Sequence, residues 1–181
     1  MDIKNSERLK FRLMDSTDAQ ALWEIDQDPA VMKFLNGGTP TSIEQINKVF
    51  IPRMNKYRNS KLGWGIWHVS DKVTNKYLGW VLIRPMSFFT ESPNTKDLEL
   101  GWRFFQTIWG KGYATEAAIA IRDAVVANTD VTHVSALAVM DNLASIGVMK
   151  KMGMRFIRAY LHEDPIGDFD AVHYQMTVNN K

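Results

Sequence analysis

Apolar and polar residues recur at helical spacing in the first third of the chain, between signals that begin and end helices. Residues 17–20 (TDAQ) have the form of a capping box, and the apolar residues that follow predict a helix that ends at Asp28-Pro29. Residues 41–44 (TSIE) have the same form and predict a second helix that runs to about Tyr57. Pro52 has no backbone N–H to donate, so it is expected to disturb this second helix.

Other segments follow the two-residue period of strands. Residues 8–13 (RLKFRL) alternate strictly between basic and apolar side chains, which predicts a half-buried strand. Residues 133–139 (HVSALAV) are almost continuously apolar, as expected of a strand that is covered on both faces. The remaining predicted strands are residues 64–69, 77–83, 97–104, 155–161 and 171–178, of which the first two form a hairpin.

Two further helices are predicted in the second half. Residues 114–128 carry apolar side chains at positions i, i+3, i+4 and i+7, and residues 142–152 form a shorter helix that ends at Gly153. The order β-α-α-β-β-β-α-β-α-β-β predicts an α/β protein whose mixed (α+β) sheet packs against helices. Because no linker interrupts the pattern, residues 1–181 are predicted to form a single domain.

Composition and charge narrow the function classes. The chain has 22 basic and 20 acidic residues, a balance that predicts neither nucleic-acid nor membrane-surface binding. The N-terminus lacks the apolar core of a secretory signal, and no segment approaches the ~20 apolar residues of a membrane span. We therefore expect a cytoplasmic protein, and a homodimer is compatible with the sequence.

The chain contains no cysteine. Disulfides, cysteine-based metal sites and a cysteine nucleophile are therefore excluded. The four histidines are scattered without the spacing of metal ligands, so no metal site is expected.

Residues 109–117 (WGKGYATEA) place two glycines directly before the predicted helix 114–128. The first N–H groups of a helix have no internal partner, and the helix dipole adds partial positive charge there. A phosphate can bind these N–H groups where no β-carbon blocks its approach. Gly110 and Gly112 would leave that approach open, and Lys111 would add positive charge.

Several interpretations compete for this glycine loop. A P-loop is excluded, because Gly112 follows Lys111 where serine or threonine is required and one residue separates the glycines. A dinucleotide fingerprint is poorly matched, because Thr115 stands at the place of its last glycine. The pyrophosphate of coenzyme A and a plain turn without a ligand both stay open on spacing alone.

The glycine loop resembles motif A of the GNAT superfamily of acyl-CoA-dependent N-acetyltransferases. Gly112 and Ala114 match the last two places of that motif. Trp109 stands where glutamine or arginine is usual, a departure typical of the branch that includes the ribosomal-protein N-terminal acetyltransferases.

Three neighbouring segments add to the resemblance. Residues 142–145 (NLAS) and 151–156 (KMGMRF) are similar to the next motif of that branch, and residues 99–102 (ELGW) to its fourth-strand segment. The resemblance covers residues 97–156 strongly, and the first half of the chain matches in element order and in its NGG turn.

The resemblance implies the GNAT acyl-CoA N-acyltransferase fold, with acetyl-CoA as cosubstrate. Members of the family bind pantetheine where the fourth and fifth strands splay apart, here residues 97–104 and 133–139. Glu116 is expected to be a surface carboxylate that stabilises the helix dipole and points away from the phosphates. The implied cofactor-binding residues are Arg103, Phe104 and Phe105 through their backbone, Gly110, Lys111, Gly112, Tyr113, Ala114 and Thr115 at the pyrophosphate, and Asn142 and Ser145 on the following helix.

Glu99 is the candidate catalytic base, acting through water. Acetyl transfer from a thioester requires an amine that has lost its proton. Without a cysteine to carry the acetyl group, the simplest route is direct attack in a ternary complex. Glu99 lies between Leu98 and Leu100, so it faces the opposite side of its strand. A solvated strand face or an ion pair with Arg103 is the alternative.

Ser145 is the candidate partner of the leaving thiolate. Many family members place a tyrosine acid seven residues after the motif asparagine, but Met149 occupies that place and cannot donate a proton. Ser145 lies one helical turn earlier on nearly the same face, and a role in capping the helix is its alternative. Asn142 is expected to cap the helix, Trp109 to lie in the core and His173 to be a satisfied sheet residue.

The sequence therefore predicts an acetyl-CoA-dependent N-acetyltransferase that acts on a primary amine. The branch resemblance favours the α-amine of a protein or peptide, while polyamines, aminoglycosides and amino acids stay open. The acidic segment 163–170 is compatible with attraction of a cationic acceptor, and also with an ordinary solvated loop. A non-catalytic acyl-CoA-binding module, supported by the missing tyrosine, and a nucleotide-binding protein are the other open classes.

Overall fold

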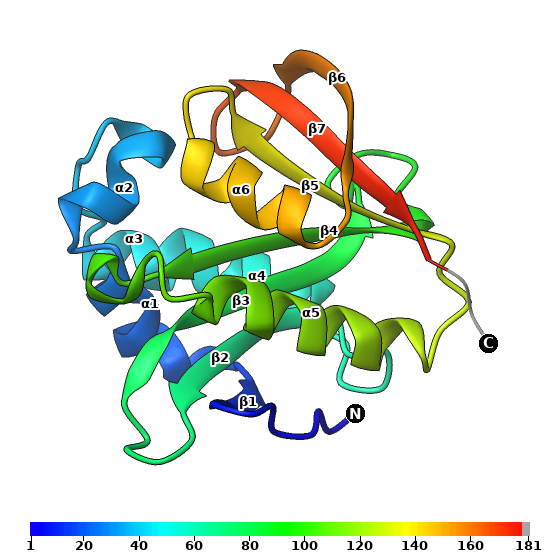
Figure 1. The fold of residues 1–181 in the computed structure, drawn as a ribbon. Coiled ribbons are helices and arrows are strands. Elements are labelled where there is room, and N and C mark those ends of the chain that lie inside the picture. The colour runs from blue at the N-terminus through cyan, green and yellow to red at the C-terminus, as the bar shows by residue number, and fades with distance from the viewer. Residues whose placement is uncertain (179–181) are drawn as a thin grey trace.

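The computed structural model describes residues 1–178 and contains one seven-stranded sheet in the order β1-β2-β3-β4-β5-β7-β6 (Figure 1). All neighbouring strands are antiparallel except β4 and β5, which are parallel. This confirms the predicted mixed sheet. The strands are β1 (Leu9–Leu13), β2 (Gly65–Asp71), β3 (Tyr77–Met86), β4 (Asn94–Phe104), β5 (His133–Val139), β6 (Arg155–His162) and β7 (Phe169–Thr177).

Helices cover both faces of the sheet (Figure 1). Apolar side chains of α5 and α6 pack with those of β4, β5 and β7 in one core cluster, which also includes the fully buried Trp67 of β2. Side chains of α1, α2 and α4 pack with Ile66 and Trp80 in a second cluster on the other face. The helices are α1 (Ala19–Ile25), α2 (Pro29–Asn36), α3 (Ile43–Gln45), α4 (Ile51–Tyr57), α5 (Tyr113–Val126) and α6 (Leu143–Lys151).

The parallel strands β4 and β5 pair over a short distance only. Asp97–Glu99 of β4 lie opposite His133–Ser135 of β5, and the pairing ends there. Beyond this point, residues 100–104 keep their partners on β3, while residues 136–139 keep theirs on β7. The two strands therefore diverge and leave a wedge in the middle of the sheet, between the segments in which the sequence predicted it.

The first helical region differs from its prediction. The capping box is formed by Asp15 and Asp18 around a 3₁₀ turn (Ser16–Asp18), one turn before α1, and not by residues 17–20. The helix α1 ends at Ile25, before the predicted end at Asp28-Pro29, and these two residues instead begin α2, which the sequence did not predict as a helix. Asp28 accepts a hydrogen bond from the N–H of Ala30, and proline is favourable at a first helical position because its missing N–H would have no partner there.

The second predicted helix is confirmed from residue 43 to Tyr57, with its irregularity where Pro52 suggested one. The cap is Ser42, which accepts from the N–H of Gln45, and Thr41 is buried instead. A π-helical turn (Ile46–Phe50) separates α3 from α4, and Pro52 stands in the first turn of α4. Because proline cannot donate to the carbonyl four residues earlier, the regular ladder is interrupted at this place. Within residues 1–178, no helix has the length and apolarity needed to cross a membrane.

Candidate functional site

A cavity of about 340 Å³ lies beside the end of β4 that diverges from β5, and we call it the wedge cavity. Its walls are α2, the end of β4, the glycine loop with the start of α5, and α6. Nine of the predicted cofactor-binding residues line it: Arg103, Phe104, Gly110, Gly112, Tyr113, Ala114, Thr115, Asn142 and Ser145. Residues from three separate motifs of the sequence therefore meet at one place.

The glycine loop owes its two glycines to backbone conformation. Gly110 and Gly112 have φ angles of 75° and 81°, in the left-handed region that other residues adopt only at a cost. A β-carbon on Gly110 would meet no atom within 4 Å, and one on Gly112 would lie 3.5 Å from Nη2 of Arg8. In the protein alone, the loop is thus open on its outer side.

The N-terminus of α5 presents free backbone donors to the wedge cavity. The first helical hydrogen bond runs from the N–H of Glu116 to the carbonyl of Gly112, 3.0 Å away. The N–H groups of Tyr113, Ala114 and Thr115 precede it, and such groups have no partner inside a helix. Gly112 is the N-cap and has no side chain to satisfy them. The site therefore has the donors and the dipole that bind an anion.

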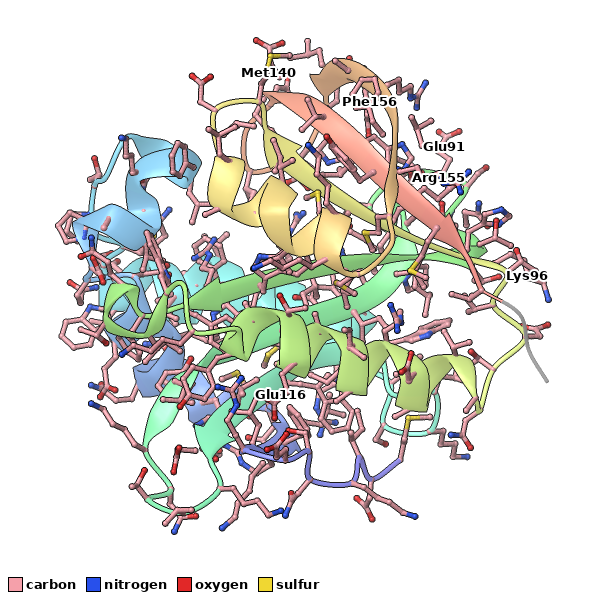
Figure 2. All side chains as sticks on the ribbon, viewed as in Figure 1. Glu91, Lys96, Glu116, Met140, Arg155 and Phe156 are labelled. Carbon is pink, nitrogen blue, oxygen red and sulfur yellow. The ribbon has the colours of Figure 1, made fainter. Side chains whose placement is uncertain are left out.

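Glu116 does not line the wedge cavity, but it is partly buried and paired with Arg8 where the sequence predicted a surface carboxylate. It accepts hydrogen bonds from the hydroxyl of Ser6 at 2.7 Å and from the backbone N–H and Nε of Arg8 at 2.9 and 2.7 Å. Figure 2 shows Glu116 on the side of α5 that faces the N-terminal segment. These hydrogen bonds hold the pKa of Glu116 below its ordinary value, against the opposing effect of burial. Glu116 thus ties α5 to the start of β1.

Three residues of this region do not lie where the sequence predicted them. Phe105 does not line the wedge cavity; its N–H donates to the carbonyl of Leu78 in β3, and its ring packs on Tyr77. Lys111 also lies outside the lining, with its Nζ 3.0 Å from the carbonyl of Thr107. Trp109 was predicted to lie in the core, but it is 40% exposed and lines the cavity, with its Nε1 2.6 Å from the carbonyl of Phe104.

On α6, the described contacts separate the roles of three residues. Asn142 caps the helix as predicted, because its Oδ1 accepts from the N–H of Ser145 at 3.1 Å. Ser145 lines the wedge cavity, and its hydroxyl has no hydrogen-bond partner within residues 1–178. Met149 is completely buried in the core. The helix therefore offers one hydroxyl to the cavity, from Ser145.

A second cavity of about 390 Å³ adjoins the wedge cavity, and we call it the ion-pair cavity. Leu35 and Arg103 line both. Glu99 lines the ion-pair cavity together with Asp26, which follows α1, and with the aromatic rings of Tyr57 in α4 and Trp80 in β3. The structure thus places Ser145 and Glu99 in neighbouring cavities on either side of β4.

Three arginine–carboxylate pairs line the ion-pair cavity. Arg103 pairs with Asp26, the residue that follows α1, at 2.5 Å, which corrects the predicted alternative of a Glu99–Arg103 pair. Arg53 pairs with Asp164 at 2.5 Å and so joins α4 to the loop between β6 and β7. The third pair joins Arg84 to Glu99.

The pair between Glu99 and Arg84 leaves one carboxylate oxygen available. Nε and Nη2 of Arg84 lie 2.9 and 2.8 Å from Oε2 of Glu99, whereas Oε1 accepts no hydrogen bond within residues 1–178. Arg84 is itself buried between the rings of Tyr57 and Phe89. Burial raises the pKa of Tyr57 to about 12, so its hydroxyl stays protonated. Glu99 is therefore held in a fixed orientation by a buried cation.

The sequence analysis did not predict Asp26, Arg84 or Trp102 as residues of the site. Arg84 carried a usable signal, because it is a charged residue inside the apolar run of β3. Asp26 and Trp102 carried no such signal in the sequence. Asp26 is an acidic residue after a helix, and Trp102 is one of many aromatic residues in the chain. Within residues 1–178, no three His, Asp or Glu side chains are grouped closely enough to hold a metal ion.

Comparison with known proteins gives the family. The sequence matches the acetyltransferase (GNAT) domain family over residues 8–155. It is similar to an N-acetyltransferase of uncharacterised function from Bacillus subtilis, YnaD, with 31% identity over 150 residues that cover 83% of this chain and 81% of the relative. It is also 27% identical over 143 residues to the FsC-acetyl coenzyme A-N(2)-transacetylase of Aspergillus fumigatus, covering 77% of this chain and 59% of that protein.

Solved structures of acetyltransferases have the same fold as this chain. A GNAT-family acetyltransferase from Bacillus anthracis superposes with a TM-score of 0.74 at 27% identity, covering 98% of each chain. The ribosomal-protein α-N-acetyltransferase RimL, in complex with coenzyme A, has a TM-score of 0.74 at 18% identity over 98% of each chain and shares the fold. An aminoglycoside acetyltransferase in complex with coenzyme A has a TM-score of 0.74 at 15% identity over 93% of this chain and 94% of that one. The fold is that of an acetyltransferase domain. The chain belongs to the GNAT acetyltransferase family.

Proposed function

We propose that the protein transfers the acetyl group of acetyl-CoA to a primary amine by direct attack in a ternary complex. One observation carries the proposal: β4 separates an anion-binding wedge cavity from an ion-pair cavity that contains Glu99. Direct transfer from acetyl-CoA to an amine needs one site for the phosphate-bearing thioester and an adjoining site for the amine.

The wedge cavity would hold acetyl-CoA. The free N–H groups of residues 113–115 and the charge of Lys111 would bind the pyrophosphate. Backbone groups of successive strand residues point to opposite edges, and the N–H of Phe105 already donates to β3. The edge of β4 that faces the wedge is therefore that of Trp102 and Phe104. We propose these two residues, rather than Arg103 and Phe105, as the backbone partners of the pantetheine amides.

Glu99 and Ser145 would serve the two reacting atoms. Oε1 of Glu99 would accept a proton from the acceptor ammonium, directly or through one water, and free the nitrogen lone pair. The nitrogen would then attack the thioester carbonyl, the C–N bond would form and the C–S bond would break. The hydroxyl of Ser145 would donate a hydrogen bond to the leaving sulfur, which takes up the second amine proton.

For the acceptor, we propose the α-amine of a peptide or protein. The sequence resemblance of residues 97–156 to the branch of ribosomal-protein N-terminal acetyltransferases supports this choice. A small cationic amine is the second candidate. It is favoured by the acidic residues that the loop between β6 and β7 places in the wall of the ion-pair cavity, Asp164 and Asp168.

Thiol release from acetyl-CoA, measured with a thiol reagent across peptides and small amines, tests the proposal. The chain has no cysteine, so the protein contributes no background. Release with peptides that have a free N-terminus, and none with N-terminally blocked copies, would support the α-amine. Release only with polyamines or aminoglycosides would replace it with the second candidate. Binding of acetyl-CoA without release by any amine would favour a non-catalytic acyl-CoA-binding module.

A further inference from the structure

A short chain of polar side chains crosses the sheet on the face opposite α5 and α6. Apolar side chains of β4, β5 and β7 pack with those two helices, so the intervening residues of each strand face the other way. Among them are Asp97 of β4, Ser135 of β5 and His173 of β7. Their exposed fractions are 6%, 0% and 7%. His173 was predicted to be a satisfied sheet residue, but it belongs to a buried cluster and its Nδ1 has no hydrogen-bond partner within residues 1–178.

The hydrogen bonds in this cluster have a direction. The hydroxyl of Ser135 donates to Oδ2 of Asp97 at 2.9 Å. Having given its one proton to Asp97, the same oxygen accepts from Nε2 of Gln175 at 3.1 Å and from Nε2 of His173 at 2.8 Å. This arrangement places the proton of a neutral His173 on Nε2 and leaves Nδ1 as a base.

Two buried atoms of the cluster have no partner in the described part of the chain, Nδ1 of His173 and Oδ1 of Asp97. A buried polar atom without a partner is unfavourable and requires a reason. Burial also lowers the pKa of His173 and raises the pKa of Asp97, so both side chains are driven toward their neutral forms. A proton added at Nδ1 can shift the Nε2 proton to Ser135 and the Ser135 proton to Asp97. The cluster then holds the extra proton with no charge left buried.

A third cavity, of about 380 Å³, connects this cluster with Glu99. Asp97, His173 and Glu99 all line it. Glu99 also lines the ion-pair cavity, so its carboxylate lies at the boundary between the two spaces. A polar cavity of this size holds several water molecules. Water can therefore link the free Oε1 of Glu99 to the region of His173.

We propose that His173, Ser135 and Asp97 form a proton relay that takes up, through water in the third cavity, the proton that Glu99 removes from the acceptor amine. The inference rests on the proposed acetyl transfer. In this reaction the acceptor ammonium loses two protons and keeps one hydrogen as the amide N–H. It starts with three hydrogens, leaves one on sulfur, retains one on nitrogen and gives one to Glu99. The relay restores the Glu99 carboxylate for the next turnover and later releases its proton to solvent.

Other charged and titratable groups face the relay. On β6, Arg158 opposes protonation of His173, and Tyr160 packs edge-on against its ring at a centroid distance of 6.4 Å. His162 lines the third cavity beside them. On β5, His133 lies opposite Asp97 and favours its anionic form. Asp97 in turn favours protonation of His173, which couples the two ends of the relay.

The tautomer of His173 tests the relay without any acetyl transfer. Nitrogen NMR of the labelled wild-type protein at neutral pH is expected to show the proton on Nε2. It is expected to lose this preference in the variant Ser135→Ala, which removes the hydroxyl between the two end groups. A proton on Nδ1 in the wild type would overturn the proposal, because the relay would then already be filled. This result does not depend on whether the proposed function is correct.

Turnover supplies the second test. In dilute buffer, Ser135→Ala is expected to lower kcat by about 10²-fold, within the usual range for a lost proton transfer, while acetyl-CoA binding is unchanged. Added imidazole is expected to restore much of this loss, because a small buffer can carry the proton from Glu99. The matched control is Gln175→Met, which removes a donor to both Asp97 and Ser135 that no relayed proton passes through.

The two variants separate a relay from a structural role. An equal kcat and equal buffer response of Ser135→Ala and Gln175→Met would overturn the relay, as would a loss in Ser135→Ala that buffer does not restore. Absence of transfer by the wild type to every amine would instead count against the proposed function, and the tautomer would still decide the relay geometry.

Discussion

The wedge cavity and the ion-pair cavity present different kinds of functional groups. The functional groups of the wedge cavity are mainly backbone groups, since the glycine loop, the start of α5 and the open edge of β4 provide its donors. The ion-pair cavity is built from side chains, with three arginine–carboxylate pairs between distant elements. This difference fits the proposed function, in which the first site would bind acetyl-CoA and the second the acceptor amine.

The largest effect is expected from Glu99→Gln on the ion-pair side. Loss of the proton acceptor should lower kcat on the order of 10²- to 10³-fold, while acetyl-CoA affinity stays the same. Steady-state kinetics and calorimetric titration with acetyl-CoA measure the two quantities.

The variant Asp26→Asn is the matched control, because it disrupts the Arg103 pair without removing the base. Both variants weaken a buried ion pair and should lower the melting temperature. A similar loss of kcat in the two would show that Glu99 acts only through the structure, and the contrast between the cavities would then fail.

On the wedge side, Gly112→Ala should mainly affect the cofactor. An alanine at φ 81° is strained by about 1–2 kcal/mol, so the loop is expected to shift and acetyl-CoA affinity to fall by about tenfold. Calorimetric titration measures the affinity. Gly167→Ala is the control, since Gly167 has a φ of 136° in the loop between β6 and β7 and a β-carbon there meets no atom within 4 Å. The Gly167→Ala variant should lose stability without losing acetyl-CoA affinity. Equal losses of affinity in the two variants would contradict the assignment of the glycine loop to the cofactor.

Ser145→Ala is expected to have a smaller effect on the same side. Removal of one hydrogen bond to the sulfur, worth about 1 kcal/mol, should lower kcat about fivefold and leave the acetyl-CoA dissociation constant unchanged. Asn142→Ala removes the helix cap instead and should reduce the free energy of unfolding by about 1 kcal/mol. Full activity of Ser145→Ala would reject a role at the thiolate.

The smallest effect concerns pH and stability. Burial lowers the pKa of His173 and of His68 below their ordinary value of 6.5. As pH falls through 6.5, the unfolded chain binds protons before the folded protein does, so the folded state loses stability. Thermal unfolding between pH 7.5 and 5 should show this loss, and His173→Gln and His68→Gln should each reduce it. An unchanged pH dependence in both variants would show that these rings protonate equally in the folded and unfolded states.

Much of the fold followed from local pattern. The strand β5 was predicted at its observed bounds, and α5 within two residues, because each has a regular period and clear ends. The helix α2 was missed because its signal, Pro29 after Asp28, also reads as the end of α1. The place of β7 between β5 and β6 had no local signal, since strand order depends on which edges remain open when the sheet assembles.

The sequence alone determined the wedge side of this protein, because glycine conformation, free helix N–H groups and a cap at Asn142 are properties of consecutive residues. Only the tertiary structure decided the other side. Arg84 meets Glu99, and Ser135 meets Asp97 and His173, across strands that are 15 to 38 residues apart in the chain. Such contacts depend on strand register and burial, which no short stretch of sequence specifies.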